Sequence, residues 1–130
     1  MNTPSPTVPA VKDLEAAHPI ASAWRPTLRA VVEALARGDV ELRMRPAEVD
    51  PLAPGVADQI RDYLSDYPET LVDLDEDTWS TSVSQWMDDH WQILVDLSTA
   101  ESKVSDLVLH ARVFEAGEGF RFVIDSVHVP

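Results

Sequence analysis

The chain has 130 residues, 23 acidic and 10 basic side chains, a net charge of −13 and no cysteine. This length favours a single domain with its own core, and the lack of cysteine excludes disulfides, thiolate zinc sites and a thiol nucleophile. The acidic balance argues against nucleic-acid binding, which needs lysine and arginine to displace counterions. It suits solubility alone, or fast encounter with a basic partner.

Prolines at positions 4, 6, 9 and 19 predict a flexible or loosely docked arm over residues 1–20, followed by one domain over 21–130. The first residues show neither a basic stretch nor an apolar stretch of the kind a secretory signal needs. No apolar run reaches the length of a membrane span. We therefore expect a cytoplasmic protein with no membrane partner.

Two helices are expected in the first half of the chain. The first has Ser22 as its N-cap, Pro26 in its first turn and Gly38 as its stop. Its apolar face would consist of Trp24, Leu28, Val31, Val32 and Leu35. The second runs from about Pro54 to Tyr67, before Pro68, with an inner stripe of Val56, Ile60, Tyr63, Leu64 and Tyr67. Between them, residues 40–45 alternate in polarity, which suits a short edge strand or an extended connection.

The last forty residues predict three antiparallel strands. Every second residue is apolar in three runs, which are Trp91 to Leu97, Leu107 to Val113, and Phe120 to Ile124. Gly117 and Gly119 permit a tight hairpin. If Glu115 faces Phe120, the register places Val113 opposite Phe122, Ala111 opposite Ile124, Arg112 opposite Val123, and His110 opposite Asp125.

The segment 79–87 fits either a strand or a helix by its spacing. Its serines and threonines, and the short link to Trp91, favour a β-hairpin. The expected fold class is therefore α+β, with an antiparallel sheet of four or five strands and two helices packed on one face. The other face would carry a mixed patch that contains Leu94, Val108, Phe114, Val123 and Val127, with Trp86 if the hairpin forms. Such a patch is typical of an interface, or the arm or a loop covers it.

The candidate chemistry is sparse. Asp73, Asp75 and Asp77 have calcium-loop spacing, but Thr78 and Ser84 stand where such a loop needs glycine and glutamate, so a solvated acidic loop is favoured. His110 beside Asp125 could orient a general base; without a nucleophile nearby, a surface ion pair is the simpler interpretation. The four scattered histidines indicate no metal site, and no cofactor is expected. Three tryptophans within residues 79–91 suit core packing or an aromatic-walled pocket.

Residues 91–109 carry the pattern W-x-x-L-V-D-L-S-T-A-E-S-x-x-S-D-L-V-L, and residues 127–130 read V-H-V-P. The pattern resembles a family of small bacterial proteins, a domain of unknown function. The resemblance covers about the last half of the chain and the helix at 24–38. That family has a glycine before Ser105, where this chain has residues 100–104 without one. The resemblance implies no activity and no catalytic residue. The small size, the acidity and the α+β build are also similar in type to immunity proteins of bacterial toxin systems.

The leading hypothesis is a non-enzymatic binding protein that holds a basic protein partner, as an immunity-type or accessory factor. Charge would act mainly on the association rate. The steering residues would be Asp73, Asp75, Glu76, Asp77, Asp88 and Asp89, and the contact anchors Trp86, Arg112 and Phe114. A second hypothesis is a small-ligand or enzymatic pocket between helices and sheet, lined by tryptophan and served by His110 and Asp125. A third is an orphan domain that forms a homodimer through the sheet.

Overall fold

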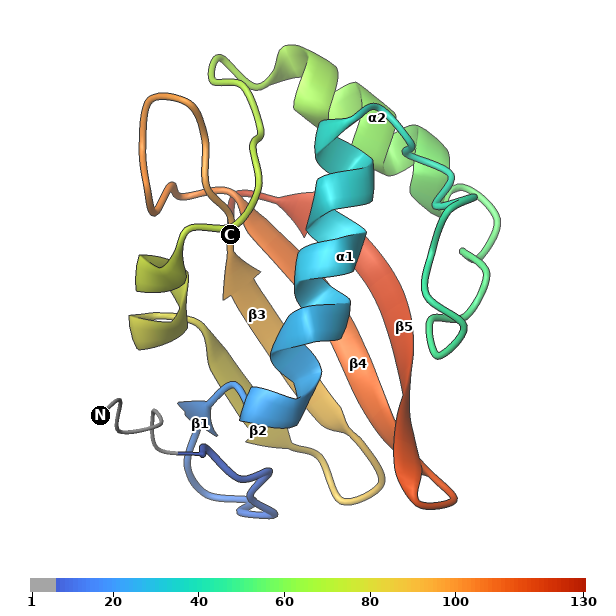
Figure 1. The fold of residues 1–130 in the computed structure, drawn as a ribbon, viewed down its shortest axis with the longest axis vertical. Helices are drawn as coiled ribbons and strands as arrows, with labels where there is room; N and C mark the ends of the chain where they lie inside the picture. Colours follow the sequence, from blue (N-terminus) through green and yellow to red (C-terminus); the bar gives the residue numbers. More distant parts are fainter. Residues whose placement is uncertain (1–6) are drawn as a thin grey trace, which may run out of the picture.

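The computed structural model describes residues 7–130 as a five-stranded antiparallel sheet with two α-helices (Figure 1). The expected α+β class is confirmed. The elements in chain order are β1 (His18–Pro19), the 3-10 helix η1 (Ser22–Trp24), α1 (Arg25–Ala36), α2 (Val56–Asp66), the 3-10 helix η2 (Glu76–Ser80), β2 (Val83–Trp86), β3 (Trp91–Asp96), β4 (Val108–Ala116) and β5 (Gly119–His128). The strands lie in the order β1-β2-β3-β4-β5, so each strand pairs with its neighbours along the chain.

The register of the last three strands follows the apolar alternation as far as Ile124. Val113 pairs with Phe122 and Ala111 with Ile124, and all four are buried, as predicted. The register then shifts by one residue, because His110 pairs with Ser126 and leaves Asp125 as the extra residue of a β-bulge. The predicted pairing of His110 with Asp125 is therefore wrong. The bulge also turns Val127 into the core, where it is fully buried, and not onto the opposite face as expected.

The fifth strand comes from the N-terminal segment. His18 and Pro19 pair with Ser84 and Val83 at the edge of the sheet. A two-residue edge strand that includes a proline offers little free backbone for further pairing. Upstream, the Trp91 indole donates to the carbonyl of Val11 at 3.0 Å. Val11, Asp13, His18 and Pro19 of the expected arm thus contact the sheet, and residues 1–6 lie outside the described chain.

Helix α1 covers the centre of the sheet (Figure 1). Its buried side chains include four of the predicted stripe, Leu28, Val31, Val32 and Leu35, while the fifth, Trp24, is buried in η1 just before it. All five join the side chains of β3, β4 and β5 in one core. The helix stops where Gly38 adopts φ +91°, with Gly38 N–H donating to Leu35 and Asp39 N–H to Ala34. The predicted stop is confirmed. The predicted N-cap is not, because the Ser22 hydroxyl accepts from the amide of Val8 instead.

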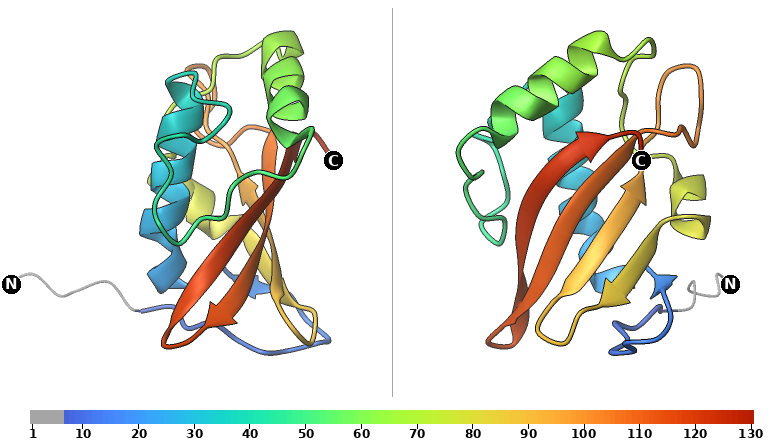
Figure 2. Two further views of the ribbon diagram at one scale, coloured as in Figure 1. Left: turned by 90° about the vertical axis from the view of Figure 1, so that its right-hand side faces the viewer. Right: turned by 180° about the vertical axis from the view of Figure 1, so that it is seen from behind.

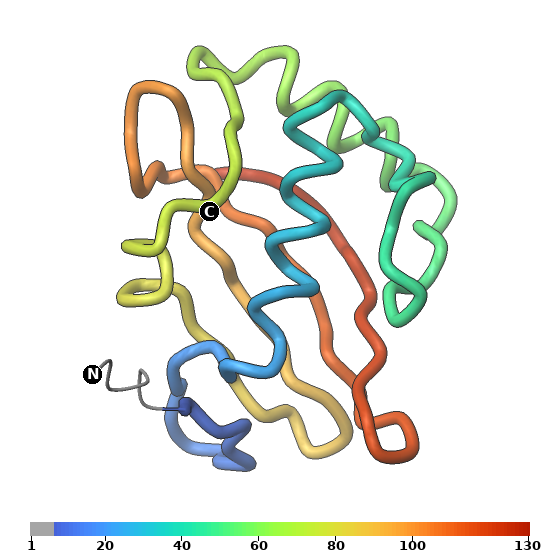
Figure 3. Tube along the Cα trace, in the orientation of Figure 1, coloured from blue at the N-terminus to red at the C-terminus, as the bar shows by residue number. Residues whose placement is uncertain are grey.

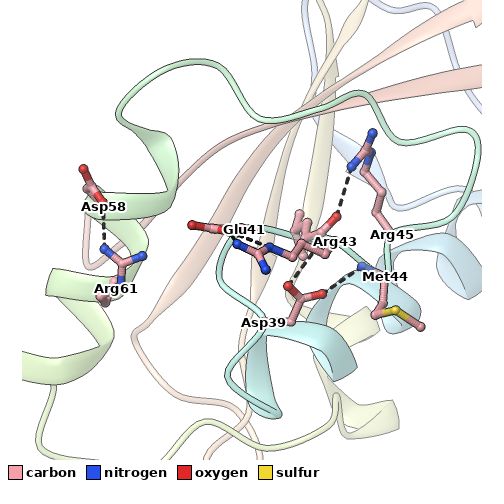
Figure 4. A network of polar contacts seen from close by, with 8 residues as sticks. Asp39, Glu41, Arg43, Met44, Arg45, Asp58 and Arg61 are labelled. Atoms are coloured by element: carbon pink, nitrogen blue, oxygen red, sulfur yellow. Dashed lines mark hydrogen bonds and ion pairs between the residues drawn. The ribbon is translucent and has the colours of Figure 1, made fainter.

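Residues 40–45 form a turn in place of a strand. The Asp39 carboxylate accepts from the backbone amides of Arg43 at 3.0 Å and Met44 at 2.9 Å (Figure 4). These two bonds lower the pKa of Asp39, with the Met44 amide the larger cause. They also hold Leu42 at φ 51°, which buries its side chain. A strand could not make this local contact, which explains the difference from the alternating pattern.

Helix α2 lies against the free edge of β5, with Ile60 fully buried (Figure 2). The Gln59 amide donates to the carbonyl of Val127 at 2.7 Å and accepts from its N–H at 3.3 Å. The Tyr63 hydroxyl accepts from the N–H of Val129 at 2.9 Å. Further along the same edge, residues 48–50 bond to Phe122. Side chains and a loop thus occupy backbone groups that an exposed edge would offer to another strand.

Two loops run side by side near one end of the sheet, residues 67–75 and residues 97–107 (Figure 3). A bridge joins Leu71 to Thr99, and Ala100 N–H donates to the carbonyl of Thr70. After the first loop comes η2, capped by the Asp75 carboxylate, which accepts from Asp77 N–H at 2.9 Å. The predicted hairpin is confirmed for β2 and β3, whereas Trp79 lies in η2 and not in a strand. No helix among residues 7–130 combines the length and apolarity needed to cross a membrane.

Candidate functional site

The face of the sheet opposite α1 has nothing laid over it in residues 7–130, as the right-hand view of Figure 2 shows. We call this surface the open face. Most of its side chains are half-buried; Val108 is buried and Val83 is 37% exposed. It consists of Val83, Gln85, Gln92, Leu94, Asp96, Val108, His110, Arg112, Phe114, Arg121, Val123, Asp125, Ser126 and His128. The mixed character predicted for this face is present, although Trp86 and Val127 are not part of it.

Phe114 is the centre of one half of the open face. The guanidinium carbons of Arg121 and Arg112 lie 4.6 and 5.7 Å from the centre of its ring. The His90 ring lies 5.2 Å away at an angle of 31°. Arg121 also pairs with Asp50 and His90 with Asp89. The aromatic anchor is therefore already surrounded by two guanidinium groups, each paired with a carboxylate, and by the His90 ring.

The Asp125 carboxylate forms its ion pair with Arg112 and not with His110. The guanidinium donates two hydrogen bonds to the carboxylate, at 2.9 and 2.8 Å. This fork geometry raises the pKa of Arg112, and the hydrogen bonds to Asp125 are the largest cause. The bulge explains the pairing, because the extra residue moves the Asp125 side chain beside Arg112 on the neighbouring strand.

His110 contacts an amide in place of a carboxylate. The Gln92 side-chain nitrogen lies 2.6 Å from His110 Nε2, where its N–H can donate to the ring nitrogen. Beyond it, Ser126 Oγ lies 3.0 Å from His128 Nδ1, and the two histidine rings are 6.1 Å apart. A general base at His110 would need a carboxylate to orient its ring, and none of these contacts involves a carboxylate. No three His, Asp or Glu side chains of residues 7–130 come together as a metal site requires.

The tryptophans are packing residues of the core side. Trp24 and Trp91 are 0% and 1% exposed, with ring centres 5.1 Å apart in an edge-on arrangement, so no water-sized space adjoins them. Trp86 pairs with Trp91 across β2 and β3 and lies on the same side, 4.6 Å from it. It is half-buried, and Lys12 Nζ lies 5.0 Å from its ring centre. Trp86 therefore cannot join Phe114 and Arg112 in one contact surface.

The predicted acidic residues fall into two groups that lie at opposite ends of the β2–β3 hairpin (Figure 1). In the first, Asp73 and Asp77 are exposed, whereas Asp75 caps η2 and Glu76 pairs with Arg29. In the second, Asp88 and Asp89 form the hairpin turn, with Asp88 at φ 78°. Only part of each group is free to act on a partner.

A further acidic region was missed. Asp62 and Asp66 line a hollow of about 490 Å³ together with Gln59, Tyr63, Tyr67 and Pro68. The Tyr67 hydroxyl donates to Asp106, which raises the pKa of Tyr67 to about 12. Nearby, the Glu69 carboxylate accepts from the hydroxyl of Thr99, and the Glu101 carboxylate from the backbone amide of Thr70. A like-charged pair four residues apart at the end of a helix was the sequence signal that could have drawn attention to it.

Comparison with known protein families yields a match that covers most of the chain. The family described as domain of unknown function DUF7668 matches residues 32–130, which is most of the chain. The protein belongs to this family. No curated protein and no solved structure matches it.

The DUF7668 match begins inside α1 and runs to the last residue. It therefore includes α2, the hollow beside Tyr63 and Tyr67, and strands β2 to β5 with the whole open face. It leaves out β1 and η1, and with them Val11 and Trp24, which contact Trp91. Both candidate surfaces are thus part of the family domain, whereas the N-terminal segment packs on its core side.

Proposed function

We propose that this DUF7668 protein binds a basic protein partner without catalysing a reaction, as a bacterial immunity-type or accessory factor. The observation that supports the proposal is the state of its charges. Within the described chain, six of the ten lysines and arginines form ion pairs, each with a different carboxylate. This leaves 17 of the 23 acidic side chains without a lysine or arginine partner. These carboxylates give the protein a negative electrostatic potential, which attracts basic molecules and repels acidic ones.

The proposed contact combines steering by charge with contact by the open face. Asp73 in the loop before η2 and Asp77 within η2 carry free carboxylates near one end of the β2–β3 hairpin, and Asp88 lies in the turn at its other end. Phe114 and Arg112 supply the aromatic and guanidinium groups that often dominate binding energy at interfaces. Exposed carboxylates of this kind raise the association rate more than they lower the dissociation rate.

The test compares three tagged proteins in pull-downs from the native organism, followed by mass spectrometry and stopped-flow kinetics with the captured partner. Asp73→Asn/Asp77→Asn removes two free steering charges and leaves the Asp75 cap and the Glu76 ion pair intact. Glu15→Gln/Glu118→Gln removes two exposed charges elsewhere and is the matched control. We expect a basic partner whose association rate falls about threefold at low salt in the first variant only, with the difference lost near 0.5 M salt.

Capture of no basic protein by the native chain would overturn the proposal. So would an association rate that does not depend on ionic strength. A rate that falls equally in the two variants would show that net charge acts without the loop, and would remove Asp73 and Asp77 from the proposed site.

One observation favours a second candidate, which is that the open face is uncovered. An antiparallel sheet can expose one face to water, but this one carries Leu94, Phe114 and Val123. A homodimer that buries the face would have twice the 14.4 kDa mass of the chain in sedimentation equilibrium. Val123→Lys should then restore the monomer mass. A wild-type chain that stays at 14.4 kDa at high concentration refutes this candidate.

A further inference from the structure

We infer that the hollow between Tyr63 and Tyr67 receives an arginine side chain of a basic protein partner. The inference rests on the proposed function and adds to it the place and the chemical group. The hollow has a volume of about 490 Å³, lies at the C-terminal end of α2, and is lined by Gln59, Asp62, Tyr63, Asp66, Tyr67 and Pro68.

The walls of the hollow are held in place before anything binds. Gln59 is fixed by both of its amide atoms to Val127. Tyr63 is fixed through its hydroxyl to Val129, and Tyr67 through its hydroxyl to Asp106. Three lining side chains therefore have little rotamer freedom left to lose, which lowers the entropic cost of binding.

The two free carboxylates of the hollow are poorly placed for the isolated protein. Asp62 and Asp66 lie four residues apart on one helix, where like charges repel. Asp66 is also the last residue of α2, where the helix dipole is negative, and the last turn contains no basic residue. The nearest cation of the helix, Arg61, is bonded to Asp58 at 2.7 Å (Figure 4). A cation in the hollow would relieve both unfavourable interactions.

An arginine side chain fits a hollow that combines aromatic rings with carboxylates. Its planar guanidinium can stack on a tyrosine ring while it donates paired hydrogen bonds to a carboxylate. The hollow is lined by two phenol rings and by the side chains of Asp62 and Asp66. Because the hydroxyl groups of both tyrosines are already engaged, the rings present mainly their aromatic surfaces to a ligand.

The test uses a short glycine peptide with one central arginine and the same peptide with citrulline, which keeps the shape and lacks the charge. Binding to the whole chain is measured by NMR titration at low salt. The arginine peptide should shift the amides of residues 59–68, and the citrulline peptide should not. Asp62→Asn/Asp66→Asn should weaken arginine-peptide binding at least tenfold, while Glu15→Gln/Glu118→Gln, which removes equal charge elsewhere, should change it less than twofold.

Equal shifts with the citrulline peptide, or equal weakening in both variants, would overturn the inference. Retention of tight binding by Asp62→Asn/Asp66→Asn would do the same. These results are separable from failure of the proposed function. A captured basic partner that binds this variant as well as the native chain refutes the hollow alone, whereas absence of any basic partner refutes the function while the peptide titration still reports on the hollow.

Discussion

The contact of α2 with the edge of β5 should depend strongly on Gln59. In Gln59→Ala both the N–H and the carbonyl of Val127 lose their partners. Each hydrogen bond contributes about 1 kcal/mol net to the free energy of unfolding, so the loss of both costs about 2 kcal/mol. The higher helix propensity of alanine returns about 0.3 kcal/mol, which leaves a net destabilisation of about 1.7 kcal/mol. With an unfolding entropy of about 0.27 kcal/mol/K for a chain of this length, Tm should fall by about 6 °C.

The assays are thermal and urea unfolding followed by tryptophan fluorescence, together with hydrogen exchange of the Val127 amide. Ser65→Ala is the control, because Ser65 is exposed on the same helix and should change the unfolding free energy by less than about 0.5 kcal/mol. Exchange at Val127 should accelerate in Gln59→Ala and stay unchanged in the control. A free energy of unfolding within about 0.5 kcal/mol of the native value, with Val127 still protected, would show that apolar contacts such as those of Ile60 hold α2 alone.

Three further predictions concern other parts of the molecule. Because its backbone partners lower the pKa of Asp39, this carboxylate stabilises the fold above its ordinary pKa, and the effect is lost as pH falls through the lowered value. Asp39→Asn should therefore cost about 1 kcal/mol at pH 7 in urea titrations, and the difference should disappear in strong acid. Tyr67 should ionise near pH 12 in absorbance at 295 nm, and its stabilisation, complete below pH 10, should be lost between pH 10 and 12 and be absent in Tyr67→Phe. Trp24→Ala should cost about 3–5 kcal/mol in the same urea assay, because the ring is fully buried.

The regular parts of the fold could be predicted because their causes lie in the sequence. Alternation of apolar residues fixed the pairing of Val113 with Phe122, since a slip by one residue would expose both. Gly38 and Gly117 adopt positive φ, as the positions after a helix and within a hairpin require. These features are local, or depend on burial of one face, and need no knowledge of distant residues.

The irregular parts depend on contacts that the pattern does not contain. No residue type announces the bulge at Asp125, because any register that buries Ile124 satisfies the alternation up to that point. The turn at residues 40–45 exists because one carboxylate, Asp39, accepts two amides. Strand β1 needs His18 to reach Ser84, a contact across more than sixty positions.

The candidate sites also combine features visible in the sequence with features that depend on distant contacts. The acidic loop at 73–77 is visible as composition, but which of its carboxylates are free depends on Arg29 and on the start of η2. The hollow was missed because Tyr63 and Tyr67 fit the inner stripe of a helix. They do pack against the core, but their hydroxyl ends reach Val129 and Asp106. A side chain can satisfy the core and line a hollow at once, and periodicity reports only the first role.

The bulge connects the core of the sheet with the hollow. Without the bulge, Asp125 would lie opposite His110, Ser126 and His128 would face the core, and Val127 would point to the open face. With it, Val127 is buried, and its N–H and carbonyl meet Gln59 while Val129 meets Tyr63. The same backbone contacts that fix α2 on the edge of β5 thus fix two lining residues of the hollow. Deletion of Asp125 removes the bulge but keeps Ile124 opposite Ala111 and Ser126 opposite His110, so Val127 should stay buried. The NMR amide shifts of residues 59–68 should therefore change little, and a large change there would show that the bulge itself, and not the register beyond it, places Val127 against Gln59.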